Sequence, residues 1–379
     1  MKAVGIICEY NPLHLGHKKQ LTLLRQMLPD HGIVCLMSGN FVQRGSPAII
    51  DRSRRAEAAL ACGADLVLEL PITAALSSAE GFAAGGVSIL GSFCDALCFG
   101  AEQADPQPLL DTAAALLSPA FPPALRTHLD HGLSFPAARA AALADLGLDQ
   151  NLLSTPNNIL AVEYCKAILD QGCSMKPLPI HREGSYHDQD PDDANPSATA
   201  VRRMILEDQS WGSYVPPEAH AIFENAPIHT LEAGHRSILS RLRTMTDEEF
   251  EALPFGSEGL WRKLMHASRQ YASLEQIAAA TKSKRYTRTR IDRMILCAFL
   301  GLTAADLAAP VPYARVLALN DRGREILKNA RNHGLFPNIG EKLGHPYEQL
   351  ENRADALYGL FTTDAPTAPI TAPRIIFRP

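Results

Sequence analysis

The fold of this chain is decided by residues 3–17, which read AVGIICEYNPLHLGH. The run from Ala3 to Ile7 is small or apolar throughout, and this predicts a short buried strand. Asn11-Pro12 then predicts a turn, and the apolar spacing after it predicts an amphipathic helix. His14 and His17 stand three residues apart, so we expect them on one face of the first helical turn.

The junction between this strand and helix is a favourable place for an anion. Free amide groups and the positive end of the helix dipole point there, and Gly16 lets a phosphate approach the backbone. His-x-Gly-His after an N-terminal strand is the signature of the nucleotidyltransferase superfamily, in which the two imidazoles hold nucleotide phosphates. A zinc pair and two ordinary surface histidines remain as alternatives. The position at the junction favours phosphate binding.

Composition limits the class of protein. At 379 residues the chain is long enough for two domains, and 46% hydrophobic with 20% charged residues is typical of a soluble globular protein. No apolar run approaches the roughly 18 residues of a membrane span, and we see no signal-peptide pattern, which predicts a cytoplasmic protein with no membrane partner. The eight scattered cysteines favour reduced thiols and predict no metal site. With a net charge of −5, binding of nucleic acid requires a local basic patch.

The first two hundred residues alternate predicted strands and helices. Strands are predicted at 3–7, 33–37, 65–70, 96–99 and 175–181, and helices at 15–28, 51–62 and 77–90. Apolar strands between helices predict an α/β fold with a parallel, Rossmann-like nucleotidyltransferase sheet. Ligands bind at the carboxyl ends of such strands, where residues 11–17, 38–45 and 100–102 are expected to meet.

Two further segments lie in this half. Residues 106–151 are rich in alanine and leucine, which predicts helices with a break at Pro122-Pro123, and residues 154–158 predict another helix start. Residues 183–196 are polar, acidic and proline-containing. They fit a substrate loop and a plain linker equally well.

The stretch SATAVRR at residues 197–203 brings two hydroxyls and a guanidinium to the start of a helix. Ser197, Thr199 and Arg202 can hold the β and γ phosphates of a nucleotide and follow the pyrophosphate as it leaves. A plain N-cap serine beside an exposed arginine is the alternative. Nucleotidyltransferases carry this cluster together with His-x-Gly-His, so the combination is more specific than either motif alone.

Beyond residue 206 the sequence predicts amphipathic helices alone to residue 361, followed by a flexible tail at 362–379. Residues 282–293 hold six cations and one anion, and Tyr286 adds a stacking surface. This composition suits RNA phosphates and unstacked bases, and a solvated helix face fits it equally well.

Together these blocks resemble the bacterial tRNA(Met) cytidine acetate ligases, a nucleotidyltransferase-like family. The resemblance covers most of the chain and rests on residues 5–17, on MSGNFVQRG at 37–45, PNNIL at 156–160, SATAVR at 197–202 and KRYTRTR at 284–290. Leu13 and Leu15 stand where the family often has Phe and Asn, and both histidines are retained.

The resemblance implies an ATP-dependent ligase that forms acetyl-adenylate and transfers the acetyl group to N4 of the wobble cytidine of elongator tRNA(Met), giving N4-acetylcytidine. ATP, acetate and this tRNA are the implied partners, with Mg²⁺ on the phosphates. Acetate is already a nucleophile, so the protein has to screen the repulsion between carboxylate and triphosphate. A nucleotidyltransferase acting on a small cofactor precursor and a non-catalytic RNA-binding protein with a nucleotide pocket remain as alternatives.

The residues are assigned as follows. The catalytic candidates are His14, His17, Ser197, Thr199 and Arg202. The family pattern places Ile7, Cys8, Glu9, Tyr10, Asn11, Pro12, Leu13, His14, Leu15, Gly16, His17, Lys18, Lys19, Gln20, Gly100, Asn157 and Arg182 in the ATP site. From their place at the sheet edge, we expect acetate or the target base to be held by Ser38, Gly39, Asn40, Gln43 and Arg44.

The basic run supplies the candidates for tRNA contact, which are Lys282, Lys284, Arg285, Tyr286, Arg288, Arg290 and Arg293. The predicted domains are therefore an ATP-binding catalytic domain at 1–205, a helical tRNA-binding region at 206–361 and the tail at 362–379.

Overall fold

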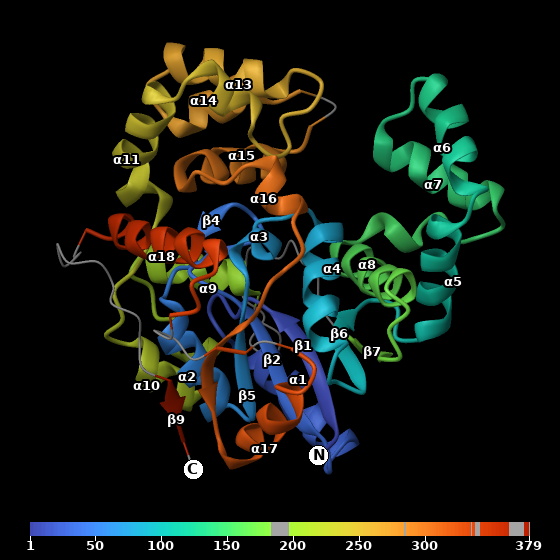
Figure 1. Ribbon diagram of the computed structural model, residues 1–379, viewed down its shortest axis with the longest axis vertical. Helices are drawn as coiled ribbons and strands as arrows, with labels where there is room; N and C mark the ends of the chain where they lie inside the picture. The colour runs from blue at the N-terminus through green and yellow to red at the C-terminus, as the bar shows by residue number, and fades with distance from the viewer. Residues whose placement is uncertain (183–196, 284–285, 335, 338–341, 364–374, 379) are drawn as a thin grey trace.

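The computed structural model describes residues 1–182, 197–283, 286–334, 336–337, 342–363 and 375–378 (Figure 1). Its centre is a seven-stranded sheet with the order β7-β6-β1-β2-β5-β8-β9. The strands are β1 (Ala3–Cys8), β2 (Gly32–Ser38), β5 (Leu66–Leu70), β6 (Ala96–Ala101), β7 (Lys176–His181), β8 (Arg315–Leu319) and β9 (Ile376–Phe377). The first five in the chain pair in parallel, which confirms the predicted Rossmann-like α/β sheet.

Helices cover both faces of the sheet because its central strands are apolar on both sides. In β2, Ile33 and Cys35 point into one core while Val34 and Leu36 point into the other. One face carries α1 (Leu15–Met27), α2 (Arg52–Ala61) and α10 (Pro217–Phe223). The other face carries α4 (Ala79–Leu90), α5 (Pro106–Leu117), α8 (Pro156–Asp170) and α17 (Asp321–Ala330), with the short α3 (Ile72–Ala75) leading into α4.

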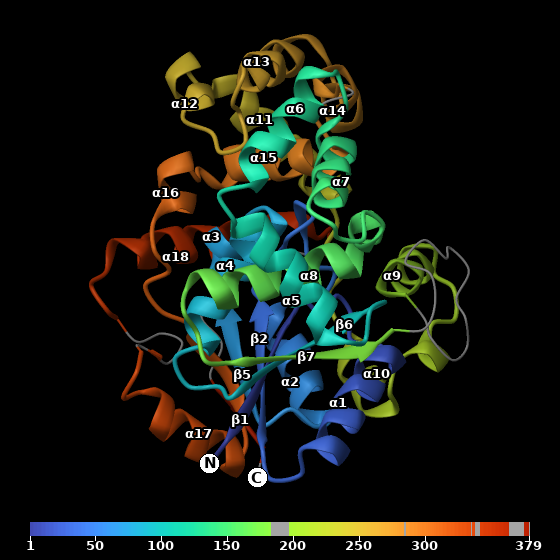
Figure 2. The same cartoon turned by 90° about the vertical axis from the view of Figure 1, so that its right-hand side faces the viewer.

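A second group of helices stands over the carboxyl ends of the parallel strands (Figures 1 and 2). It comprises α11 (Leu231–Thr244), α12 (Asp247–Glu251), α13 (Leu260–Gln270), α14 (Leu274–Thr281), α15 (Arg288–Leu300), α16 (Ala304–Ala308) and α18 (Pro346–Tyr358). Its core includes Phe41 from the two-stranded ribbon of β3 (Phe41–Val42) and β4 (Ser46–Pro47). The ribbon therefore joins the helical group to the sheet. Among the described residues, no helix is both long and apolar enough to cross a membrane.

Helices α6 (Phe121–Asp130) and α7 (Phe135–Asp145) project from the sheet as an arm with a small core of its own (Figure 1). The helices are interrupted near Pro122-Pro123, as the sequence predicts: α5 ends at Leu117, and the two prolines lie in the first turn of α6. A first turn tolerates proline because its backbone N–H groups have no partner within the helix.

The predicted helical region after residue 206 is confirmed, but the expectation that it contains no strand is wrong. Strand β8 enters the sheet antiparallel to β5, and α10 packs against α2 on the face of the sheet. In the predicted flexible tail, Ile376–Phe377 pairs with β8, while residues 364–374 and 379 lie outside the described part of the chain. A strand of five residues that begins with arginine gives little periodic signal, because its place is set by pairing with β5, which is distant in sequence. The division into functional domains stays a prediction.

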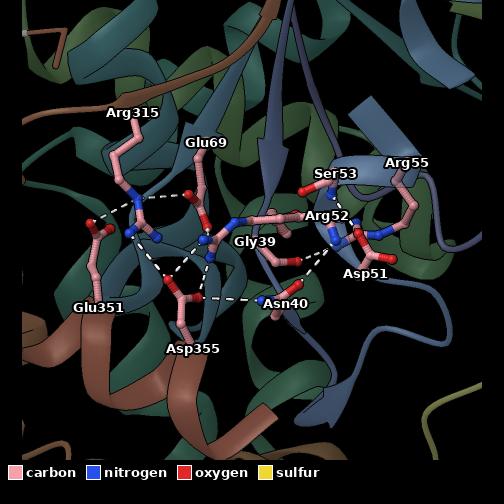
Figure 3. Close-up of polar contacts among 11 residues, drawn as sticks. Gly39, Asn40, Asp51, Arg52, Ser53, Arg55, Glu69, Arg315, Glu351 and Asp355 are labelled. Atoms are coloured by element: carbon pink, nitrogen blue, oxygen red, sulfur yellow. Dashed lines mark hydrogen bonds and ion pairs between the residues drawn. The ribbon is translucent and has the colours of Figure 1, made fainter. Parts of the chain in front are cut away.

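A buried charge cluster, formed by Arg52, Glu69, Arg315, Glu351 and Asp355, ties α18 to the sheet (Figure 3). Arg52 donates to Asp355 (Nη2 to Oδ2, 2.8 Å) and to Glu69 (Nη1 to Oε1, 3.1 Å). Arg315 donates from Nε to Glu69 at 2.8 Å, and it pairs with Glu351 at 3.1 Å and Asp355 at 3.2 Å. A buried charge without a partner of opposite sign is strongly destabilising. The cluster therefore holds α18 in a fixed position relative to the sheet.

Candidate active site

A cavity of about 390 Å³ opens at the carboxyl ends of β1, β6 and β7, the edge at which parallel sheets bind ligands. The end of β1 and the start of α1 form one side of it, and the β3–β4 ribbon contributes another. The start of α8, the end of β7 and the start of α9 (Ala198–Leu206) complete the lining. Segments nearly two hundred residues apart in the sequence therefore meet around one space.

His14 and His17 are held in fixed orientations at the start of α1. Nδ1 of His14 accepts the backbone N–H of Gly16 at 3.1 Å, and Nδ1 of His17 accepts that of His14 at 3.3 Å. The two rings stack with their centroids 3.7 Å apart. Because each Nδ1 accepts a hydrogen bond, a neutral ring has to carry its proton on Nε2. Both histidines are therefore N–H donors at Nε2.

Both rings are neutral at physiological pH. Burial and the charges of Arg182 and Arg202 lower the pKa of His14 to about 3. Burial, His14 and Arg182 likewise lower the pKa of His17 well below its ordinary value. Nε2 of His14 is buried and has no hydrogen-bond partner among the described residues. An unsatisfied donor beside two arginines fits an anionic oxygen as its partner.

Helix α9 contributes the second predicted motif. Ser197 caps the helix by accepting the N–H of Ala200 at 3.0 Å, and both Ser197 and Thr199 line the cavity. Arg202 donates to the carbonyl of Asn11 at 2.6 Å and to the hydroxyl of Thr199 at 3.1 Å. Ser197 thus caps α9 and also lines the cavity. Arg202 links α9 to the turn before α1 through its hydrogen bond to Asn11.

The start of α8 is organised by Glu102, whose role the sequence analysis missed. Its carboxylate accepts from the Thr155 hydroxyl at 2.8 Å, from Nδ2 of Asn157 at 2.7 Å and from the N–H of Asn158 at 3.0 Å. Burial would raise the pKa of Glu102, but the hydrogen bonds from Asn157 and Thr155 outweigh it and lower that pKa. Since the amide nitrogen of Asn157 faces Glu102, its oxygen faces Arg182, which donates to it at 3.3 Å. The available signal was an acidic residue close after the predicted strand at residues 96–99.

One part of the lining is apolar and was also missed. We call it the apolar wall, and its members are Phe82, Phe99, Leu160, Tyr164 and Ile180. The rings of Phe99 and Tyr164 lie 5.4 Å apart. Such residues look like ordinary core positions in the sequence, so no local signal marks them as a surface for a flat ligand.

Most of the predicted ATP-site residues line the cavity, including Gly100, Asn157 and Arg182. Four residues of the first segment are not among its lining residues, namely Pro12, Leu13, Leu15 and Lys18. Leu13 is fully buried in the core, and Lys18 lies 3.7 Å from Glu218 of α10.

The predicted substrate loop divides into two parts. Gln43 and Arg44 line the cavity, but Ser38, Gly39 and Asn40 do not. Ser38 and Asn40 are buried, and Asn40 donates to Asp355 of the buried charge cluster at 3.3 Å. These three residues therefore lie inside the protein and do not line the cavity.

The basic run is also divided. Lys284 and Arg285 lie outside the described residues, and Lys282 is exposed. Arg288 is paired with Glu275 and Asp292, and the guanidinium of Arg290 lies 4.8 Å from the Tyr286 ring centroid.

Arg293 departs from its predicted role in tRNA contact. Its side chain is buried and donates to the carbonyl of Gln43 at 3.3 Å. The apolar face of α15 carries this position inward, and charge alone did not reveal it.

Comparison with known proteins agrees with this geometry. The family model of the HIGH nucleotidyl transferases matches residues 1–369. The tRNA(Met) cytidine acetate ligase of Anoxybacillus flavithermus is 35% identical over 94% of both chains, and that of Clostridium novyi is 36% identical over 89% of both. The crystal structure of apo Thermotoga maritima TmcAL covers 100% of both chains at 29% identity with a TM-score of 0.90. The same protein bound with alpha-thio ATP gives a TM-score of 0.88.

Proposed function

Because the chain belongs to the HIGH nucleotidyl transferase family, and within it to the tRNA(Met) cytidine acetate ligases, we propose that it is an ATP-dependent acetate ligase. It activates acetate as acetyl-adenylate and transfers the acetyl group to N4 of the wobble cytidine of elongator tRNA(Met), giving N4-acetylcytidine. One observation carries the proposal: two neutral histidines and Arg202 converge on a cavity at the sheet edge.

In the first half-reaction, an acetate oxygen attacks the α phosphorus of ATP, and the bond from that phosphorus to the pyrophosphate oxygen breaks. The Nε2–H groups of His14 and His17 donate to phosphate oxygens as charge develops on them. Arg182 and Arg202 stabilise the same charge, and Ser197 with Thr199 follows the leaving pyrophosphate. Donors held in place before the reaction are effective because they need no reorganisation during it.

The nucleotide base lies on the apolar wall, where the flat faces of Phe99 and Tyr164 suit a purine. No group of three or more His, Cys, Asp or Glu side chains able to hold a metal ion occurs in the part of the chain that the structure describes. When bound with ATP, magnesium would be coordinated mainly by phosphate oxygens and water and would screen the triphosphate charge.

The tRNA approaches from the helical group above the cavity. Lys282, Tyr286, Arg288 and Arg290 lie at the end of α14 and the start of α15, and we assign them to contact with RNA phosphates and bases. Arg293 acts inside the protein, where it supports the ribbon that borders the cavity.

The test is incubation with ATP, Mg²⁺, acetate and total bacterial tRNA, followed by mass analysis of the nucleosides. N4-acetylcytidine that requires both acetate and ATP supports the proposal. Pyrophosphate release with another acceptor, and no modified cytidine, would point to a nucleotidyltransferase acting on a small cofactor precursor. Binding of tRNA without either product would point to a non-catalytic RNA-binding protein.

A further inference from the structure

Glu9 stands out among the residues that line the cavity. It follows directly after β1 and is the one carboxylate in the lining, as far as the described residues go. The same lining contains His14, His17 and His181 together with one lysine and three arginines. A carboxylate would repel an anionic ligand in this cavity, so we ask whether Glu9 has a chemical role or a structural one.

The structure fixes the position of Glu9 through both its backbone and its side chain. Its Oε1 accepts the backbone N–H of Gln43 at 2.8 Å, and its carbonyl accepts from the buried Arg55 at 2.6 Å. Arg55 also donates to the carbonyls of Ser38 at 3.2 Å and Ile50 at 2.8 Å. The second carboxylate oxygen has no hydrogen bond or ion pair from the described residues, so it is available to a ligand.

Glu9 lies on the side of the cavity that the helical group approaches. The residue that binds its carboxylate, Gln43, accepts from Arg293 of α15 through its own carbonyl at 3.3 Å. The ribbon and α15 are closely packed there, because a Cβ at Gly45 would collide with the backbone of Arg293. The carboxylate is thus next to the segment that separates the cavity from the basic start of α15.

Transfer of the acetyl group releases a proton that some group has to accept. When N4 of cytosine attacks the acetyl carbon, the new C–N bond forms, the bond to the phosphate oxygen breaks and AMP leaves. The former amine then carries one proton too many. Among the lining residues, lysine and arginine side chains offer N–H donors and no acceptor. Burial raises the pKa values of Cys8, Tyr10 and Tyr164, so these groups keep their own protons.

The geometry of the cavity leaves two lining residues, Glu9 and His181, as candidates for accepting this proton. His14 and His17 have no free lone pair, because each Nδ1 accepts a backbone N–H and each Nε2 carries the proton. His181 keeps a lone pair on Nε2, since its Nδ1 donates to the carbonyl of Glu102 at 3.1 Å. It lies beside Arg182 and Asn157 at the end of β7, however, whereas Glu9 lies beside the ribbon.

We propose that Glu9 is the general base of acetyl transfer and takes the proton from N4 of the cytosine as the C–N bond forms. This inference rests on the proposed ligase function and adds a residue to its second half-reaction. General bases typically contribute about 10²–10⁴ in rate.

The test separates the two half-reactions in Glu9→Gln, which keeps an oxygen to accept the N–H of Gln43. Acetate-dependent ATP–pyrophosphate exchange measures the first step. The second is measured in a single turnover, by adding tRNA(Met) to enzyme loaded with labelled acetyl-adenylate. Because Glu9 lines the cavity assigned to ATP, we expect exchange to fall by up to about tenfold and transfer to fall much further, by about 10²–10⁴. Filter binding should give an unchanged affinity for tRNA.

His181→Gln is the matched variant, and in it we expect transfer to fall far less than in Glu9→Gln. The reverse pattern would overturn the proposal, as would normal transfer in Glu9→Gln. A fall in exchange as large as the fall in transfer would also overturn it, because Glu9 would then act mainly on the nucleotide or its metal. If Glu9→Gln unfolds at a lower temperature than wild type, Glu9→Asp replaces it, and the displaced carboxylate should slow transfer more than exchange. If wild type forms no N4-acetylcytidine, the ligase function itself fails.

Discussion

The cavity and the buried charge cluster both gather arginines, but they balance the charge differently. In the cluster, Arg52 and Arg315 are paired with the carboxylates of Glu69, Glu351 and Asp355. In the cavity, positive groups surround two histidines that are held neutral, and Nε2 of His14 is unsatisfied within the described structure. The positive charges of the cluster are therefore balanced by carboxylates of the protein, whereas those of the cavity require an anionic ligand to balance them.

This contrast predicts the largest effect on stability at Asp355. Burial alone would raise the pKa of Asp355, but Arg52 and Arg315 outweigh it and hold that pKa below its ordinary value. Asp355→Ala leaves both guanidinium groups with one partner fewer, and we expect the free energy of unfolding to fall by about 3–5 kcal/mol. Urea unfolding measures this change. The exposed Asp170→Ala is the control, and an equal loss in both variants would contradict a special role for the cluster.

His17→Ala should have the opposite profile, with a large effect on activity and a small one on stability. The variant removes one donor to the phosphates, and we expect acetate-dependent pyrophosphate exchange to fall by about 10²–10³. The lost capping contact lowers stability by about 1 kcal/mol. His333→Ala, at an exposed position in the turn after α17, should leave exchange unchanged. If His17→Ala retained normal exchange, that result would contradict the role assigned to this ring.

The burial of His14 in its neutral form also predicts that the stability of the protein depends on pH. The folded pKa of His14 is about 3 and its ordinary value is 6.5, so between these values only the unfolded chain binds the proton. The stability contribution of this residue is present above pH 6.5 and is lost as the pH falls toward 3. One proton corresponds to a slope of about 1.4 kcal/mol per pH unit, and His14→Asn should remove it. Unfolding curves from pH 7 to about 5 test this, and an unchanged slope would contradict it.

The smallest effect is expected at Glu102, which orients a ligand-binding group without being one. Glu102→Ala removes three hydrogen bonds and leaves the amide of Asn157 able to turn away from Arg182. We expect the KM for ATP to rise by up to about tenfold, with little change in kcat. Kinetics of pyrophosphate exchange provide both values. A lower kcat at constant KM would mean that Glu102 acts on the transition state.

Local sequence patterns were sufficient where an element depends on its own residues. The strand predicted at residues 3–7, the turn after it and the place of the two histidines in the first helical turn could be predicted because apolar periodicity and helix-start signals act over a few positions. The same holds for Ser197 as the N-cap of α9. Residues that depend on distant partners could not be predicted in this way.

The missed features share one physical cause. Asn40 binds Asp355 across 315 positions, and Arg293 binds Gln43 across 250. The place of Asn40 at the sheet edge and the charge of Arg293 suggested that both face a ligand, but contacts between distant segments turn them inward. Glu9 was placed in the ATP site by the family pattern, yet its contact with Gln43 appears only in the folded chain.

The antiparallel strand β8 has a consequence for how the protein can be divided. A fragment ending near residue 205 would lack β8 and α10, would leave the outer edge of β5 unpaired, and would lose three of the five members of the buried charge cluster. The nucleotide-binding part of the chain and the helical group thus cannot be exchanged between relatives as two independent domains. Chimeras that preserve function have to carry residues 315–319 and α18 together with the sheet that they complete.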